Sequence, residues 1–260
     1  MKKILTLVRK DLGELWSSRN LMVTFFLFSA LSWYYFAWMS YDFARFCEQR
    51  GETRVTIENY WQYNVDLSLI RDILSFNFFL LLFFLPYLLL SLLSEEKKQQ
   101  WRSYFTSYRI SGKQYLTAKA LLQLLLVALF TGSSVLIQYL AIRAAVDEPL
   151  NHLYFISTYF MTVIFLVMIL TLSAFTFFRM DSLLKGLVTT YVVLIFFWLV
   201  HIPLENQPGL IPALFQEISF SYRVEKIMEG LFRLRDLAYF IFIIIFLNFA
   251  TYQSLKKQKL

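Results

Sequence analysis

The first candidates for chemistry are the residue patterns that build nucleotide and metal sites. A phosphate-binding loop has the pattern GxxxxGK[ST], in which backbone amides and a lysine hold the phosphates. The Gly-Lys pair at 112–113 supplies the end of that pattern, but Ser107 stands at the first glycine position and Gln114 follows the lysine. The zinc-protease motif HExxH is absent, because neither His152 nor His201 has that context. We therefore expect no metal, no cofactor and no catalytic activity in this chain.

The paired glutamates Glu95 and Glu96 raise one enzymatic alternative. They resemble the EExxxR element of the CAAX-type intramembrane proteases, and Phe197 and His201 match the FxxxH element of the same family. Arg102, however, lies two positions too late for the first element, and nothing supplies the remaining HxxxN-like element. We interpret the glutamates as the polar end of an apolar segment.

A second pattern lies in the stretch SEEKKQQWRSYFTSYRISGKQYLTAK at 94–119. Trp101, Tyr104, Phe105 and Tyr108 recur at i, i+3, i+4 and i+7, which places four aromatic side chains on one face of a short helix. Such a stripe suits three roles: it can lie on lipid headgroups, pack beneath the protein's own helices, or dock into a groove of a partner. The spacing leaves all three open.

The elements that position these residues are built for lipid. The chain has 260 residues, of which 58% are hydrophobic, 19% aromatic and 17% charged, whereas soluble domains average about 25% charged residues. A membrane-spanning helix needs about 20 predominantly apolar residues. Six windows without Asp, Glu, Lys or Arg qualify: 21–41, 73–94, 120–142, 153–178, 186–202 and 237–255. The sequence thus predicts an all-α polytopic membrane protein with six transmembrane helices in a single domain, 1–260.

The basic residues divide unequally between the connecting segments. Segments 1–20, 95–119, 179–185 and 256–260 carry 16 of the 25 Lys and Arg residues, although together they are shorter than the other connections. By the positive-inside rule these four segments are cytoplasmic, so both termini are expected inside a bacterial cytoplasmic membrane. The net charge of +7 then indicates contact with the lipid bilayer, not with nucleic acid.

Three segments outside the spans have patterns of their own. Residues 1–16 place apolar side chains at helical spacing, which predicts an amphipathic helix on the inner membrane surface, either a simple anchor or a working elbow. Ser111 and Gln114 fit a capping box that begins the third span. In 203–236, prolines end the fifth helix and two short helices fit the apolar spacing that follows. The first of these is apolar enough to dip back into the outer leaflet.

Together these features resemble the permeases of type-2 ABC exporters (the ABC-2 family), in particular a gliding-motility-like branch. Stretch 94–119 is similar to the family's acidic-basic run followed by GT, LLTSP and glycine-lysine. It departs from that pattern at Gln100 and Trp101, at Tyr108 and at Ala118. The stretch ISFSYRVEKIMEGLFRLRDLAYF is similar to the aromatic-rich helix, glycine and RDL-[aliphatic]-YF that open span six. The matching residues there are Gly230, Arg235, Asp236, Leu237, Tyr239 and Phe240.

The resemblance implies a permease subunit that forms the translocation path of an ATP-driven exporter. It would pair with a second permease, itself or a paralogue, and with separate ABC-type ATPase subunits that bind ATP and Mg. An accessory membrane protein with a large extracytoplasmic domain often accompanies this branch. A coupling helix at about 99–109 and a broken, re-entrant hairpin at 203–236 are also implied. The implied ATPase-coupling residues are Glu95, Glu96, Trp101, Arg102, Tyr104, Phe105, Tyr108 and Arg109, and the implied hairpin residues are Glu217, Tyr222, Arg223, Gly230 and Asp236.

The competing interpretation is a non-transporting membrane scaffold or assembly protein whose aromatic cytoplasmic loop docks another partner. Dependence on an ATPase separates the two interpretations. The first span also bears on the substrate, because Trp33, Tyr34, Tyr35 and Trp38 crowd one half of it. These side chains fit either an interfacial aromatic belt or the lining of a path for lipid.

Overall fold

The computed structural model describes residues 2–49, 64–98, 111–145, 150–180, 182–200, 202, 209–231 and 233–258, and nearly all of these residues are helical. Five helices are long and apolar enough to cross a membrane. They are α2 (Arg19–Gln49), α4 (Arg71–Lys98), the rod of α6 (Gly112–Thr131) and α7 (Ile137–Ala145), α8 (His152–Arg179) and α12 (Leu234–Gln258). Helix α9 (Leu183–Leu199) is apolar but shorter, with 17 residues. The predicted class, an all-α membrane protein, is confirmed, and the sixth crossing stays a prediction.

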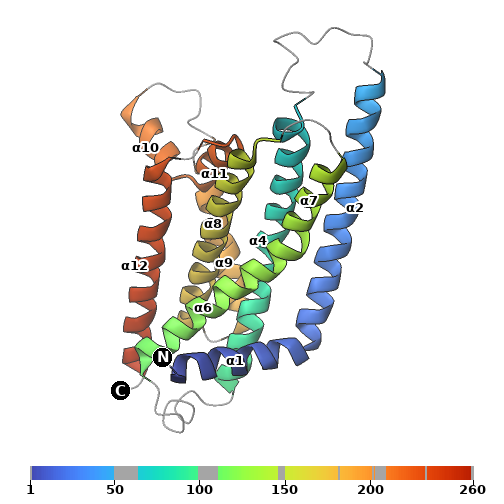
Figure 1. Ribbon diagram of the computed structural model, residues 1–260. Helices are drawn as coiled ribbons and strands as arrows, with labels where there is room; N and C mark the ends of the chain where they lie inside the picture. Colours follow the sequence, from blue (N-terminus) through green and yellow to red (C-terminus); the bar gives the residue numbers. More distant parts are fainter. Residues whose placement is uncertain are drawn as a thin grey trace.

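Helix α8 is the centre of the bundle. It contacts α4, α6, α9 and α12, and 78% of its most apolar window is buried inside the protein. Helices α2 and α12 lie at opposite edges (Figure 1), and only 22% of the corresponding window is buried in each. Because lipid tails are as apolar as leucine side chains, such outward faces suit a membrane.

A π-helical turn, η2 (Gly132–Leu136), joins α6 to α7, and a second one, η1 (Asp66–Ile70), precedes α4. Single π-turns of this kind occur frequently at functional sites. The start of α6 is fixed by the predicted capping box, which is confirmed. The Ser111 hydroxyl accepts a hydrogen bond from the Gln114 amide (3.3 Å), and Gln114 Oε1 accepts one from the Ser111 amide (3.1 Å).

Helix α1 (Lys2–Ser17) lies crosswise at the end of the bundle where α6 begins and α12 ends (Figure 1). The predicted helix is present, and Leu7, Val8 and Leu15 on its apolar side are buried. The same face carries a carboxylate that the amphipathic pattern did not reveal. Asp11 is 0% exposed, because it lies one helical turn from both Leu7 and Leu15.

Two short helices, α10 (Leu210–Ile218) and α11 (Phe220–Met228), lie at the opposite end of the bundle, as the apolar spacing predicts (Figure 1). A tight turn follows α11. There Gly230 has a φ of 77°, and a Cβ added at this position would lie 2.4 Å from Tyr154 Cδ2. Both the left-handed backbone and the close ring therefore require glycine.

Candidate functional site

The predicted coupling helix falls outside the described residues. Segment 99–110 contains Trp101, Arg102, Tyr104, Phe105, Tyr108 and Arg109, and its position is not described. Glu95 and Glu96 lie in the last turns of α4, where the backbone alone is described. The segment connects the end of α4 to the start of α6, which is the end of the bundle where α1 lies (Figure 1).

A buried ion pair ties α1 to α6 at this end. Lys119 Nζ lies 2.8 Å from Asp11 Oδ2, and the two side chains are 4% and 0% exposed. The ammonium also lies 5.2 Å from the centre of the Tyr115 ring, within the range of a cation–π contact. Removing one member of a buried pair leaves the other charge uncompensated, so the pair holds these helices together. Lys119 belongs to α6, one residue before the predicted span, and it was not identified as a site residue from the sequence.

A neutral network joins three helices in the interior of the bundle. The hydroxyl of Ser32 in α2 donates to Asn77 Oδ1 in α4 (2.6 Å), and Asn77 Nδ2 donates to Gln138 Oε1 in α7 (3.0 Å). Gln138 Nε2 closes the ring by donating to Ser32 Oγ (2.8 Å). All three side chains are fully buried. Asn77 and Gln138 could have been noticed in the sequence, because amides inside apolar spans need partners.

A second charged cluster anchors the hairpin end. Arg223 Nε and Nη2 donate to the Glu217 carbonyl (2.9 and 2.6 Å), and Nη2 also donates to Glu217 Oε2 (2.8 Å). Its Nη1 donates to Asp236 Oδ1. The guanidinium lies over the Tyr239 ring, 4.1 Å from the centre. A second arginine, Arg235, reaches Glu217 Oε1 (2.9 Å). The cluster therefore binds α10, α11 and α12 to one another.

The structure brings three of the five predicted hairpin residues, Glu217, Arg223 and Asp236, into this cluster. Gly230 lies elsewhere, at the turn against Tyr154. Tyr222 is half-buried in α11 and contacts the ammonium of Lys226 (5.7 Å to the ring centre). These residues hold the hairpin in place, and their contacts indicate positioning of α11 over the bundle.

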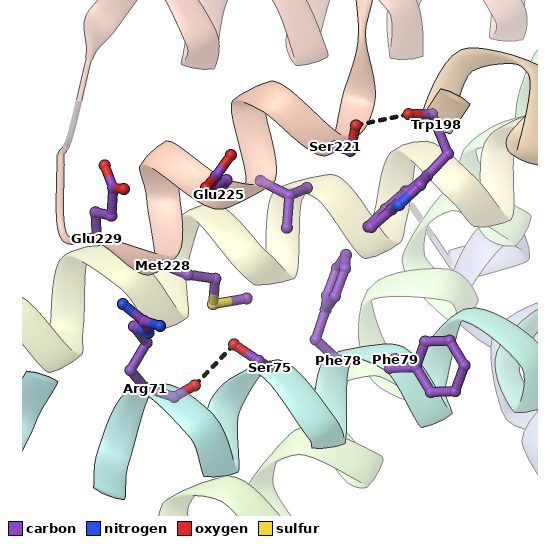
Figure 2. Close-up of a pocket in the computed structure, with 10 residues that line it drawn as sticks. Arg71, Ser75, Phe78, Phe79, Trp198, Ser221, Glu225, Met228 and Glu229 are labelled. Carbon is purple, nitrogen blue, oxygen red and sulfur yellow. Dashed lines mark hydrogen bonds between the residues drawn. The ribbon is translucent and has the colours of Figure 1, made fainter. Parts of the chain in front are cut away.

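An open cavity of about 410 Å³ lies beneath α11, between that helix and α4 (Figure 2). The Ser221 hydroxyl donates to the Trp198 carbonyl (2.6 Å) and so fastens α11 to α9. The Trp198 ring stacks on Phe78 with 6.3 Å between centres. The lining residues are Arg71, Ser75, Phe78 and Phe79 of α4, Trp198 of α9, and Ser221, Val224, Glu225, Met228 and Glu229 of α11.

The two walls of this cavity carry opposite charges. Figure 2 shows the Arg71 side chain rising from α4 toward α11, which carries Glu225 and Glu229. Arg71 Nε makes a loose 3.8 Å contact with Asp72 Oδ1, and its two terminal nitrogens have no partner within the described ranges. Glu229 Oε2 lies 3.0 Å from Lys226 Nζ, and this hydrogen bond raises the pKa of Lys226, which stays protonated at neutral pH.

No group of three His, Cys, Asp or Glu side chains in the described part of the chain could hold a metal ion. His152 instead accepts a hydrogen bond at Nε2 from Arg143 Nη1 (2.6 Å), and His201 lies outside the described residues. No protein-family model matches the chain, and no curated protein matches it significantly.

Proposed function

We propose that the chain is the permease subunit of an ATP-driven exporter and works with separate ATPase subunits. The buried Asp11–Lys119 pair is the observation that carries this proposal. Segment 99–110 is bounded by α4 and α6, and α1 is bound to α6 through this pair. A partner that pushes on the segment would therefore move the ends of three helices together, as coupling to an ATPase requires.

The outward faces of α2 and α12 support a second permease subunit. The apolar windows of these helices are 22% buried each, so large apolar surfaces remain at both edges of the bundle. A second copy of this chain or a paralogue would cover part of one edge, and lipid would cover the rest. The excess of Lys and Arg in the segments at this end favours a position of this end, with both termini, on the cytoplasmic side of a bacterial membrane.

The first test is purification of the tagged chain from its native membrane in mild detergent, followed by mass spectrometry. We expect a stoichiometric partner that carries GxxxxGK[ST]. If the chain is recovered alone, or with partners that bind no nucleotide, the exporter proposal loses its source of energy. The aromatic segment would then belong to a scaffold or assembly protein.

Point substitutions in the coupling segment give a sharper test in the purified complex. Phe105→Asp and Tyr108→Asp each place a carboxylate on the aromatic stripe of the predicted helix, whereas Ser103→Asp places the same charge on another face of that predicted helix. We expect the first two to release the ATPase or uncouple its hydrolysis from transport, and Ser103→Asp to leave both intact. Equal behaviour of all three variants would show that the stripe is not the contact surface.

A further inference from the structure

We infer that the cavity beneath α11 and an apolar groove next to it form one site for a membrane phospholipid with a phosphoethanolamine-type headgroup. The groove has a volume of about 210 Å³ and lies between α4 and α9. Phe79 and Trp198 line both the cavity and the groove, so the two spaces adjoin. The cavity volume lies within the usual range for small-molecule sites, about 300–1,000 Å³.

The depth of the combined site matches one leaflet of a bilayer. Arg71 is the first residue of α4, and Phe83, in the groove, comes twelve positions later. At 1.5 Å per residue this is about 18 Å along the helix, and one leaflet together with its headgroups is about 20 Å thick. Trp198 lies where the cavity meets the groove, and tryptophan is enriched at the boundary between headgroups and hydrocarbon.

The charges of the cavity suit a zwitterion. Arg71 on one wall has two terminal nitrogens without a partner among the described residues, and guanidinium groups bind phosphate in a bidentate manner. On the other wall, Glu225 makes no hydrogen bond or ion pair within the described ranges, and Glu229 is balanced by Lys226. No ion pair joins Arg71 to Glu225. A headgroup with a phosphate beside Arg71 and an ammonium beside Glu225 would satisfy both.

The groove suits an acyl chain, because its lining is almost entirely apolar. The hydroxyl of Tyr191, which lines the groove, donates to the Phe83 carbonyl (2.8 Å). Leu82, Leu194 and Ile195 supply much of the remaining surface. Neither part of the site involves segment 99–110, so the inference does not depend on the proposed ATPase.

The test measures lipid retention by native mass spectrometry. The full-length protein is purified in mild detergent, delipidated, and titrated with phosphatidylethanolamine or phosphatidylglycerol of identical acyl chains. Both lipids carry a phosphate, but only the first carries an amine. We expect the wild-type protein to bind phosphatidylethanolamine about tenfold more tightly, as one charge-assisted hydrogen bond predicts.

Four variants locate the site. Arg71→Gln should weaken the binding of both lipids about tenfold. Glu225→Gln should remove only the preference for phosphatidylethanolamine over phosphatidylglycerol. Ile195→Trp places a larger side chain in the groove and should weaken the binding of both lipids. Val192→Trp is its control, because Val192 is an exposed residue of α9 that does not line the groove.

Arg235→Gln is the matching charge control. Arg235 lies at the start of α12 and pairs with Glu217, outside the cavity, so both lipids should bind to this variant as they do to the wild type. Equal retention of the two lipids by the wild-type protein would overturn the headgroup assignment without any variant. The thermal midpoint shows whether each variant is folded. If Arg71→Gln and Ile195→Trp are both folded and both bind lipid as the wild-type protein does, the proposed site is wrong.

Discussion

The two ends of the bundle are both fastened by buried ion pairs, but the pairs are built differently. At the hairpin end, Arg223 uses its planar guanidinium to reach Asp236, the carboxylate and carbonyl of Glu217, and the ring of Tyr239. At the opposite end, the ammonium of Lys119 pairs with Asp11 and lies near the ring of Tyr115. A guanidinium presents five N–H donors in a fixed planar arrangement, whereas an ammonium is a compact charge with three donors on a flexible stem. The guanidinium thus fixes the hairpin over the proposed lipid site, and the ammonium ties α1 to α6 beside the proposed coupling segment.

A third kind of contact, without charge, joins helices in the interior of the bundle. Ser32, Asn77 and Gln138 join α2, α4 and α7 through neutral hydrogen bonds. Burying a charge far from water costs much more than burying an amide that finds its partners. Charge pairs therefore lie near the two ends of the bundle, and amides lie between them.

The largest effect is expected from Arg223→Met, which leaves Asp236 buried without its cation. Breaking a buried pair from one side typically costs about 3–5 kcal/mol. The free energy of unfolding in mixed detergent micelles should fall by that amount. Arg235→Met is the control, because Arg235 is 54% exposed and should change the same free energy by less than about 1 kcal/mol. Equal losses in the two variants would mean that the Arg223 cluster is not the anchor of the hairpin.

Lys119→Met should lower the free energy of unfolding by about 3 kcal/mol, because Asp11 remains buried without its cation. The double variant Asp11→Leu/Lys119→Met removes both charges and should recover to within about 1 kcal/mol of the wild-type stability. If the exporter proposal is right, this double variant should fold well but transport less substrate for each ATP that the ATPase hydrolyses. A stable double variant with full transport would show that the pair is structural only.

Gly230→Ala tests the turn that ends the hairpin. The left-handed φ and the contact with Tyr154 should together cost about 2 kcal/mol. Gly13→Ala in α1 is the matched control, because a Cβ there meets nothing within 4 Å and alanine favours a helix. Thermal midpoints in detergent should therefore move in opposite directions. A neutral Gly230→Ala would indicate that the ring of Tyr154 moves aside.

Asn77→Leu should give the smallest loss, about 1 kcal/mol, because hydrogen bonds between membrane helices are individually modest. The loss appears in the same unfolding measurement. Asn248→Leu serves as comparison, since among the described residues Asn248 Nδ2 bonds only to the carbonyl one turn earlier in its own helix. If Asn77→Leu lowered the free energy of unfolding as much as Arg223→Met does, the neutral network and the charged clusters would not differ in strength.

The site residues differ in how far the sequence reveals them. Glu217, Arg223 and Asp236 lie within 20 residues of one another, and the resemblance singled them out, although not as one cluster. Asp11 and Lys119 are 108 positions apart, and each lies in a helix that is otherwise explained by its apolar spacing. Arg71 and Glu225 come from α4 and α11, and the packing of those helices alone places them across one cavity.

The sequence by itself determined the helices and their approximate limits. Apolar runs without charge are helical in lipid because every backbone N–H and C=O must find a partner within the segment. For this reason the window 153–178 and the observed α8, His152–Arg179, agree within one residue at each end. Only the tertiary structure decided which helix faces which. Helical spacing defines an apolar side but names no partner for it, so the two ion pairs, the amide ring and the charged cavity all arise from packing between distant segments.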